Sequence, residues 1–155
     1  MTVVVIGLGN DLRRDDGIGP AVAREVADHL APGVGVTISD GDPAILLDAW
    51  SGADLAVIVD AVVCDPPRPG SVHRLTPDEL SGALAGTFST HGIRLEDALR
   101  LGAVLGRLPR RTVIIAVEVS DVGHGSGLSA AVRGALETTV SAVLTEISEA
   151  RQRAP

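Results

Sequence analysis

The stretch Val3–Pro20, VVVIGLGNDLRRDDGIGP, decides the fold because it changes character twice. Its beginning, Val3 to Gly7, is a short uninterrupted apolar run, typical of a strand buried on both faces of a parallel sheet. From Gly17 onward, apolar side chains recur at every fourth position, which predicts one face of a helix. Pro20 falls in the first turn of that helix, where its missing N–H costs no hydrogen bond. A strand, a glycine loop and a helix in this order are typical of an α/β protein.

The rest of the chain continues the alternation of strands and helices. Further strands are predicted over residues 34–39, 54–63, 71–75 and 111–119, and further helices over 44–50, 76–84, 95–105 and 129–151. The helix after Thr76 opens with a capping box, Thr76-Pro-Asp-Glu79. We therefore expect an α/β fold whose sheet is covered by helices on both faces, in a single domain over residues 1–155.

Composition restricts the partners and the compartment that we expect. The longest apolar runs, LAVIVDAVVC and TVIIAVEV, are far shorter than the roughly 20 residues that cross a bilayer. The N-terminus lacks the basic region of a signal peptide, and the single Cys64 agrees with a reducing compartment. A net charge of −7, with arginine supplying every basic side chain, is poorly suited to a phosphate backbone. We expect a cytoplasmic monomer with no nucleic-acid or membrane partner.

The glycines after the first strand do not predict a nucleotide site. Gly7-Leu8-Gly9 lacks the third glycine of a dinucleotide fingerprint, and the chain has no lysine for a phosphate-binding loop. Asp15 and Asp16 would also repel a phosphate from the start of the following helix. We interpret the two glycines as a tight turn, and the acids as either helix-capping carboxylates or working groups.

Chemistry-bearing side chains follow several of the predicted strands, where ligands bind in α/β sheets. Asp60 interrupts an apolar strand, so it is either a turn cap or a ligand or acid–base group. His91 lies in the loop FSTHG, and His124 in a glycine-rich loop has an open role, whereas His29 and His73 are expected to be structural or solvated. Two carboxylates and an imidazole suit a borderline divalent metal such as Ni²⁺ or Zn²⁺.

The chain resembles the hydrogenase maturation endopeptidases, which process the C-terminus of the large subunit of nickel-iron hydrogenases. The opening VVVIGLGNDLRRDDGIGPAVAREV, the strand IVDAVV, the loop Thr90-His91-Gly92 and the late segment GLSAAV match that family in the right order. The resemblance implies a three-layer α/β/α sandwich with a twisted, mostly parallel five-stranded sheet of the phosphorylase/hydrolase-like type. It also implies a peptidase of the aspartic class whose partner is the large-subunit precursor.

The same resemblance implies a site made of Asp16, Asp60 and His91. These three residues would be both the metal ligands and the catalytic groups, and the metal would be nickel supplied by the precursor. In one scheme they hold the nickel beside the scissile peptide and activate a water molecule. In the competing scheme Asp16 and Asp60 share a proton, as in an aspartic protease.

Two segments depart from the family pattern, and two other functions stay open. The loop Asp40-Gly41-Asp42-Pro43 replaces a Gly-Gly-Thr-like sequence, and residues 118–126 are unusually rich in glycine. A nickel-dependent checkpoint or chaperone that does not cleave would use the same ligands. A peptidyl-tRNA hydrolase also begins with a G-L-G-N strand, but it needs a histidine soon after that loop and a basic face.

Overall fold

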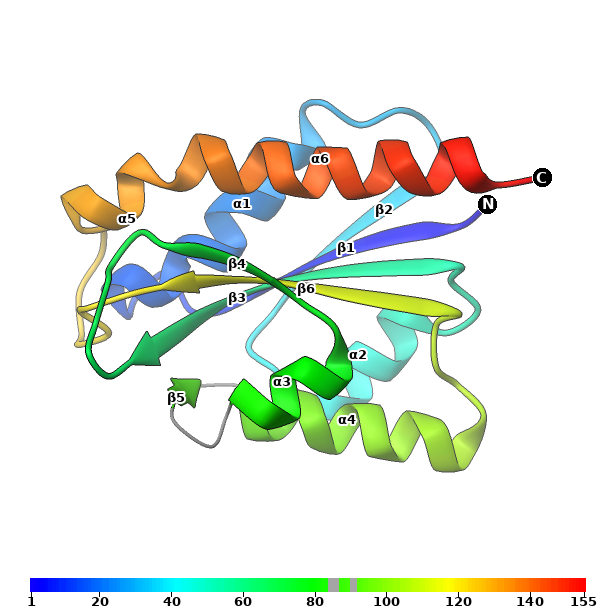
Figure 1. The fold of residues 1–155 in the computed structure, drawn as a ribbon, viewed down its shortest axis with the longest axis horizontal. Helices are drawn as coiled ribbons and strands as arrows, with labels where there is room; N and C mark the ends of the chain where they lie inside the picture. Colours follow the sequence, from blue (N-terminus) through cyan, green and yellow to red (C-terminus); the bar gives the residue numbers. More distant parts are fainter. Residues whose placement is uncertain (84–86, 90–91) are drawn as a thin grey trace.

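A twisted sheet lies between two layers of helices in the computed structural model, which describes residues 1–83, 87–89 and 92–155 (Figure 1). The main strands follow the order β2-β1-β3-β6-β4, and β5 pairs with the far end of β3. The strands are β1 (Val3–Leu8), β2 (Val34–Ser39), β3 (Leu55–Cys64), β4 (Val72–Leu75), β5 (Thr87–Ser89) and β6 (Arg111–Glu118). Pairing is parallel among β2, β1, β3 and β6 and antiparallel for β4 and β5.

Helices on the two faces of the sheet complete the three layers. They are α1 (Ile18–Ala27), α2 (Pro43–Trp50), α3 (Pro77–Ala83), α4 (Gly92–Leu105), α5 (Ala130–Gly134) and α6 (Leu136–Arg153), with a 3-10 turn η1 (Arg14–Gly17) before α1. The helices α1, α5 and α6 cover one face, and α2, α3 and α4 cover the other (Figure 1). The α/β sandwich expected from the sequence is confirmed.

Each face of the central strands has its own hydrophobic core, because successive side chains in a strand point to opposite faces. Val5 and Val57 pack toward α1 and α6, whereas Ile6 and Ile58 pack toward α2 and α4. All four side chains are fully buried. This double burial explains why the strand sequences are continuously apolar rather than alternating.

The structure differs from the sequence prediction in two elements. The short strand β5 lies where a loop was predicted, since three residues are too few to show a strand period and pairing with the end of β3 defines them. The predicted final helix is divided into α5 and α6 at Ala135, whose ψ of −8° departs from helical geometry directly after the weak helix former Gly134.

Three glycines let α1 lie directly against the end of β1. A Cβ on Gly7 would lie 2.4 Å from the Gly19 carbonyl oxygen, and one on Gly19 would lie 2.1 Å from the Leu8 carbonyl oxygen. Gly9 has a φ of +146°, and its Cβ would lie 1.9 Å from the Asp16 carbonyl oxygen. The turn prediction therefore holds for Gly9, but Gly7 is a glycine because of helix packing.

Within the residues that the structure describes, no helix combines the length and apolar character needed to span a bilayer.

Candidate active site

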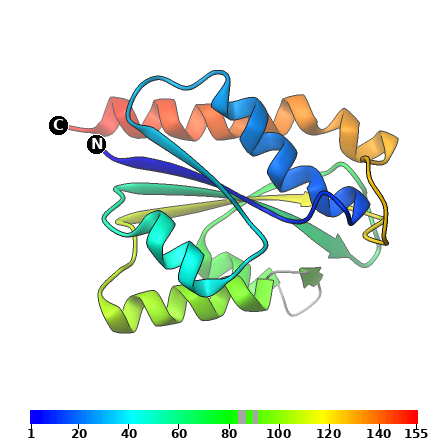
Figure 2. The same ribbon diagram turned by 180° about the vertical axis from the view of Figure 1, so that it is seen from behind.

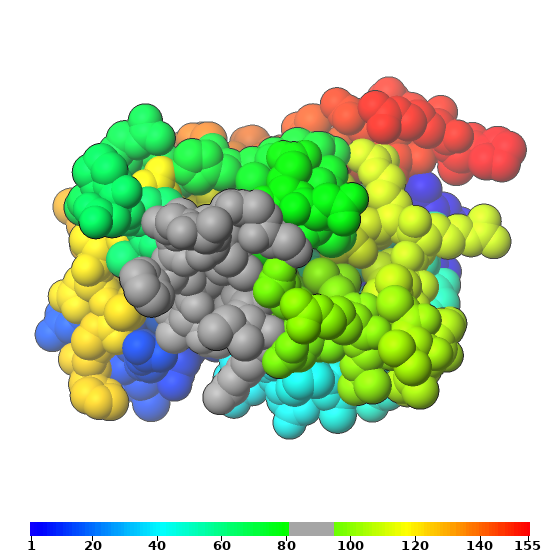
Figure 3. Space-filling view, turned by 60° about the horizontal axis from the view of Figure 1, so that its bottom comes forward, coloured from blue at the N-terminus to red at the C-terminus, as the bar shows by residue number. Residues whose placement is uncertain are grey.

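The loops that follow the parallel strands β1 and β6 meet at the carboxyl ends of these strands. The loop after β1 and the loop after β6 lie side by side there, in blue and gold at the left of Figure 3. The Arg14 N–H donates to the Gly125 carbonyl at 3.0 Å, and the Gly125 N–H donates to the Leu12 carbonyl at 2.9 Å. The loop after β1 carries Asp15 and Asp16, two of the acidic residues that the sequence singled out.

Asp16 lies in η1 and is fully buried. The Asn10 N–H donates to its Oδ2 at 2.9 Å, which fixes the orientation of the carboxylate. The close approach of Gly9 to the Asp16 backbone holds η1 at the end of β1. A side chain of any size at position 9 would displace Asp16, so the glycine loop positions the acid.

Asp60 lies in β3 with 2% of its surface exposed. The Ala61 N–H donates to its Oδ1 at 2.9 Å. Its side chain points toward the α2 and α4 layer, since it alternates with Val59 on the other face. Burial of a carboxylate in such surroundings costs free energy, so we infer that Asp60 has a functional role.

The pairing of β3 changes at Asp60. Pairing with β1 ends at Val59, and pairing with β5 on the far part of β3 begins at Val62. Asp60 lies within its strand, as the sequence predicted, and β3 continues to Cys64 by pairing with β6 and β5. It occupies the junction where the neighbour of β3 changes from β1 to β5.

The structure brings the elements that carry two of the three predicted site residues into contact, because η1 packs against β3. His91 lies outside the described residues. Among the residues that are described, no group of three histidine, cysteine, aspartate or glutamate side chains is arranged to hold a metal ion. The predicted trio of Asp16, Asp60 and His91 therefore stays a prediction.

Asp15 binds protein groups rather than facing the site. Its carboxylate accepts the Ser129 N–H at 2.7 Å, the Ser129 hydroxyl at 3.0 Å and the Asp121 N–H at 3.2 Å. Burial raises the pKa of Asp15, but hydrogen bonds from Ser129, Asp121 and Ser120 outweigh it, so the net pKa lies below the usual value. Asp15 ties the loop after β1 to the loop after β6 and does not cap α1.

His124 lies in the loop that Asp15 anchors, and its side chain is exposed. Its carbonyl oxygen accepts a hydrogen bond from the Arg14 guanidinium at 3.3 Å. His124 therefore helps to join the two loops through its backbone carbonyl.

Glu118 is a buried carboxylate that sequence reasoning missed. It ends β6 with 2% exposure and accepts from the Arg68 N–H at 3.1 Å, while the His73 Nε2 lies 2.6 Å from its other oxygen. Burial raises its pKa, but the hydrogen bonds from His73, Arg68 and Cys64 lower it below the usual value. The signal that singled out Asp60, an acid within an apolar strand, also singles out Glu118 in TVIIAVEV.

The thiol of Cys64 is not an activated nucleophile, although a histidine and an acid lie nearby. Burial, together with a hydrogen bond to Glu118, raises its pKa to about 11. A nucleophilic cysteine needs a lowered pKa and a base that accepts its proton. Here the imidazole of His73 is bonded to Glu118, so this cluster is structural, as predicted for His73.

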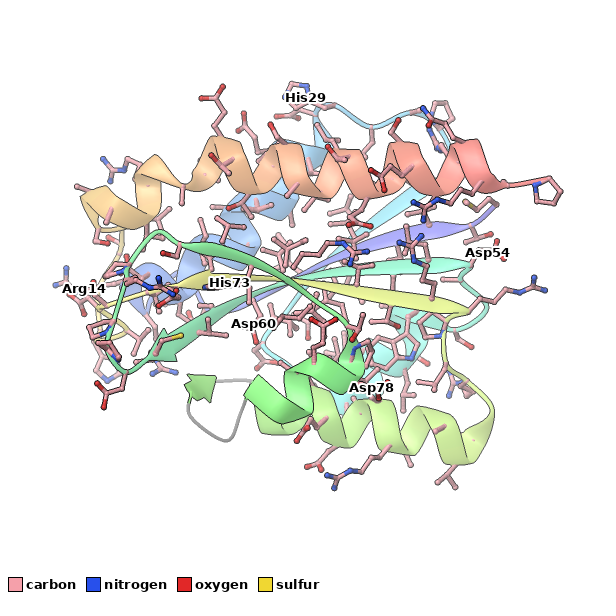
Figure 4. All side chains as sticks on the ribbon, viewed as in Figure 1. Arg14, His29, Asp54, Asp60, His73 and Asp78 are labelled. Carbon is pink, nitrogen blue, oxygen red and sulfur yellow. The ribbon has the colours of Figure 1, made fainter. Side chains whose placement is uncertain are left out.

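Asp60 and His73 are both neighbours of Ala116 across β3, β6 and β4, and they therefore share a face of the sheet (Figure 4). A hollow of about 510 Å³ lies elsewhere, between α1 and α6, and is lined by Glu25, Leu136 and Val140. The burial and chemistry of Asp16 and Asp60, rather than hollow size, locate the candidate site.

Comparison with known proteins identifies the family of this chain. A model of the hydrogenase maturation protease family matches residues 20–146. The chain belongs to the hydrogenase maturation protease family. It is therefore a peptidase, and the resemblance seen in the sequence is confirmed.

Individual members of the family match over nearly their whole length. The hydrogenase 2 maturation protease of Escherichia coli strain K12 is 26% identical over 151 residues, covering 96% of this chain and 92% of that protein. The [NiFe] hydrogenase maturation protease HybD from Thermococcus kodakarensis is 29% identical, with a TM-score of 0.80 over 94% of this chain and 98% of that one. The hydrogenase maturating endopeptidase HybD from Escherichia coli has a TM-score of 0.86 at 24% identity, covering 97% and 94%, and shows the same fold.

Family membership also decides between the functions that the sequence left open. A peptidyl-tRNA hydrolase and a checkpoint that does not cleave both disagree with membership in a family of proteases.

Proposed function

We propose that this protein is an endopeptidase that removes the C-terminal extension of the large-subunit precursor of a nickel-iron hydrogenase, and that it recognises nickel already carried by the precursor. Asp16, Asp60 and His91 are the residues that would contact this nickel and carry out the cleavage. The burial of two carboxylates, at the edge of the sheet where η1 packs against β3, is the observation that most supports the proposal.

The donor set fits a nickel ion that arrives with the substrate. Carboxylate and imidazole ligands suit borderline divalent metals, and a trio leaves positions for ligands from the precursor. The backbone N–H groups of Asn10 and Ala61 donate to Asp16 and Asp60 and orient the two carboxylates. Nickel bound to the substrate would supply Lewis-acid character next to the scissile peptide.

The protein's own groups would supply the rest of the reaction. Asp16 or Asp60 would accept a proton from the attacking water, and the protonated carboxyl group would return it to the leaving amine. Burial of both acids excludes bulk water, which strengthens their interactions with a charged substrate. Asn10 and Ala61 act through the backbone N–H bonds that hold the carboxylates in place.

An aspartic-protease-like dyad is the competing mechanism, and it requires Asp16 and Asp60 to share a proton without help from a metal. The two mechanisms differ in their need for nickel. To distinguish the two mechanisms, the precursor is purified with and without nickel and incubated with this protein. Mass spectrometry then shows which sample is cleaved.

We expect cleavage only of the nickel-loaded precursor. Equal cleavage of the precursor that lacks nickel would exclude the recognition mechanism and favour the dyad. An unchanged mass in both samples would contradict the peptidase assignment for this substrate.

A further inference from the structure

The edge strand β2 lacks the protection that edge strands usually have. Natural edges are blunted by charged side chains, proline, bulges or short length, because unpaired backbone groups attract other strands. The six residues of β2, VGVTIS, include no charge and no proline, and their pairing with β1 runs without a bulge from Val34 to Ser39. Figure 2 shows β2 at the near edge of the sheet, with α1 on one side and α2 on the other.

The opposite edge of the sheet shows the usual protection. There β4 has four residues, and two of them are His73 and Arg74. Their side chains pair with Glu118 and Glu146, which lie on β6 and α6. Of these two edge strands, only β2 lacks charged side chains.

The backbone of β2 offers hydrogen bonds on its outer side. The Ser39 carbonyl points inward, since it accepts the Gly9 N–H at 3.0 Å. Peptide groups alternate along a strand, so the N–H and C=O groups of Val36 and Ile38 point outward. Ile38, which is 42% exposed, adds an apolar side chain at the same edge.

The open strand ends beside the candidate site. Ser39 bonds to Gly9, and Gly9 packs against the backbone of Asp16. We propose that β2 binds an extended segment of the substrate as an added strand, and that this segment belongs to the C-terminal extension that the protease removes. This inference rests on the proposed function, because it names the part of the substrate that docks.

Strand geometry sets where the docked segment lies relative to the scissile bond. An added strand would lie three strand spacings from β3, or about 14 Å, with β2 and β1 between them. A chain that advances about 3.3 Å per residue needs about four residues to cross that distance to Asp60. The extension supplies this segment because it must reach the scissile position as an extended chain, and an extended chain is the form that adds to a sheet edge.

Two substitutions on β2 test the proposal with the complete protein and the nickel-loaded precursor. Val36→Pro removes an outward N–H and leaves the inward bonds to β1 in place, a position where an edge strand tolerates proline. Ile38→Lys adds the charge that protects edges elsewhere. Val104→Lys, on α4 and 84% exposed, is the matched control for an added lysine at an exposed apolar position.

We expect both β2 variants to raise KM about tenfold with kcat unchanged. Val36→Pro removes a backbone hydrogen bond to the docked segment, and Ile38→Lys places a charge where that segment would pair. The control should match the wild type. In amide hydrogen exchange, a synthetic peptide with the sequence of the extension should protect Val36 and Ile38 but not residues of β4.

Wild-type KM values in both β2 variants would overturn the inference while leaving the proposed function intact. A wild-type protein that fails to cleave the precursor would instead overturn the proposed function. If sedimentation shows a dimer that Ile38→Lys dissociates, the occupant of the edge is a second copy of this chain, and the inference is wrong.

Discussion

Asp60 is a residue whose sequence context and structural context agree. It is an acid in an apolar strand, and the structure buries it where β3 changes partners. Its neighbour Ala61 donates to it through the backbone, an interaction that an asparagine side chain can keep through its carbonyl oxygen. The charge of Asp60 can therefore be removed with little change in shape.

We expect Asp60→Asn to abolish processing of the precursor, a loss of at least about a hundredfold in rate, because the amide can neither bind a cation strongly nor accept a proton. Circular dichroism and thermal unfolding should show an intact fold. Asp78→Asn, an exposed residue in the first turn of α3, is the control and should cleave normally. Retained cleavage by Asp60→Asn would remove Asp60 from the site.

Cys64 gives a second prediction for a single residue. With a pKa raised to about 11 by burial and by the bond to Glu118, its thiolate is scarce at pH 8. We expect alkylation by iodoacetamide at pH 8 to be about a hundredfold slower than for a free cysteine with a pKa near 8.5. Glu118→Gln should speed it up, as followed by mass spectrometry. Alkylation as fast as that of free cysteine would show that the thiol is activated.

At the scale of elements, the contact between β1 and α1 depends on glycines whose separate roles could not be predicted from the sequence. The absence of a third glycine in G-x-G-x-x-G excluded a dinucleotide site, but the close packing that such a glycine serves still occurs here. Gly19, inside α1, provides it by lying against the Leu8 carbonyl. This choice of residue depends on a contact between two elements, and no local pattern reports it.

We expect Gly19→Ala to destabilise the protein by about 2–4 kcal/mol, because its Cβ would overlap backbone atoms of β1 that cannot move independently. Gly134→Ala is the matched control, since no described atom lies within 4 Å of its added Cβ. That control should be neutral or more stable by up to about 1 kcal/mol, as alanine favours helix. Urea unfolding measures both, and equal stabilities would contradict the close approach of α1 to β1.

At the scale of the whole molecule, Asp15 joins the start of the chain to its last third. Its carboxylate bonds to Ser120, Asp121 and Ser129, which lie 105 to 114 residues away in sequence. These bonds close the edge of the sheet where the candidate site lies. The sequence suggested a helix cap or a working group for Asp15 and gave no sign of its distant partners, because a long-range partner leaves no local signature.

We expect Asp15→Ala to cost about 3 kcal/mol of stability at pH 7, since several hydrogen bonds to a charged group are lost. The pKa of Asp15 is lowered in the folded protein, so its contribution is complete above the unfolded pKa of about 3.9 and is lost as pH falls through the folded pKa. The stability difference between wild type and variant should therefore shrink in acid. Asp28→Ala, an exposed residue after α1, should show almost no difference at either pH.

The sequence by itself determined the α/β alternation, the five main strands, the position of Asp60 as an acid within an apolar strand, and the likeness to the hydrogenase maturation proteases. These features depend on local periodicity and on motifs, which a linear chain carries in full. Only the tertiary structure decided that β5 extends the sheet, that Gly7 and Gly19 serve packing, that Asp15 ties distant loops and that β2 is an open edge. Each of those depends on which segments become neighbours in space, and that information is distributed over residues far apart in the chain.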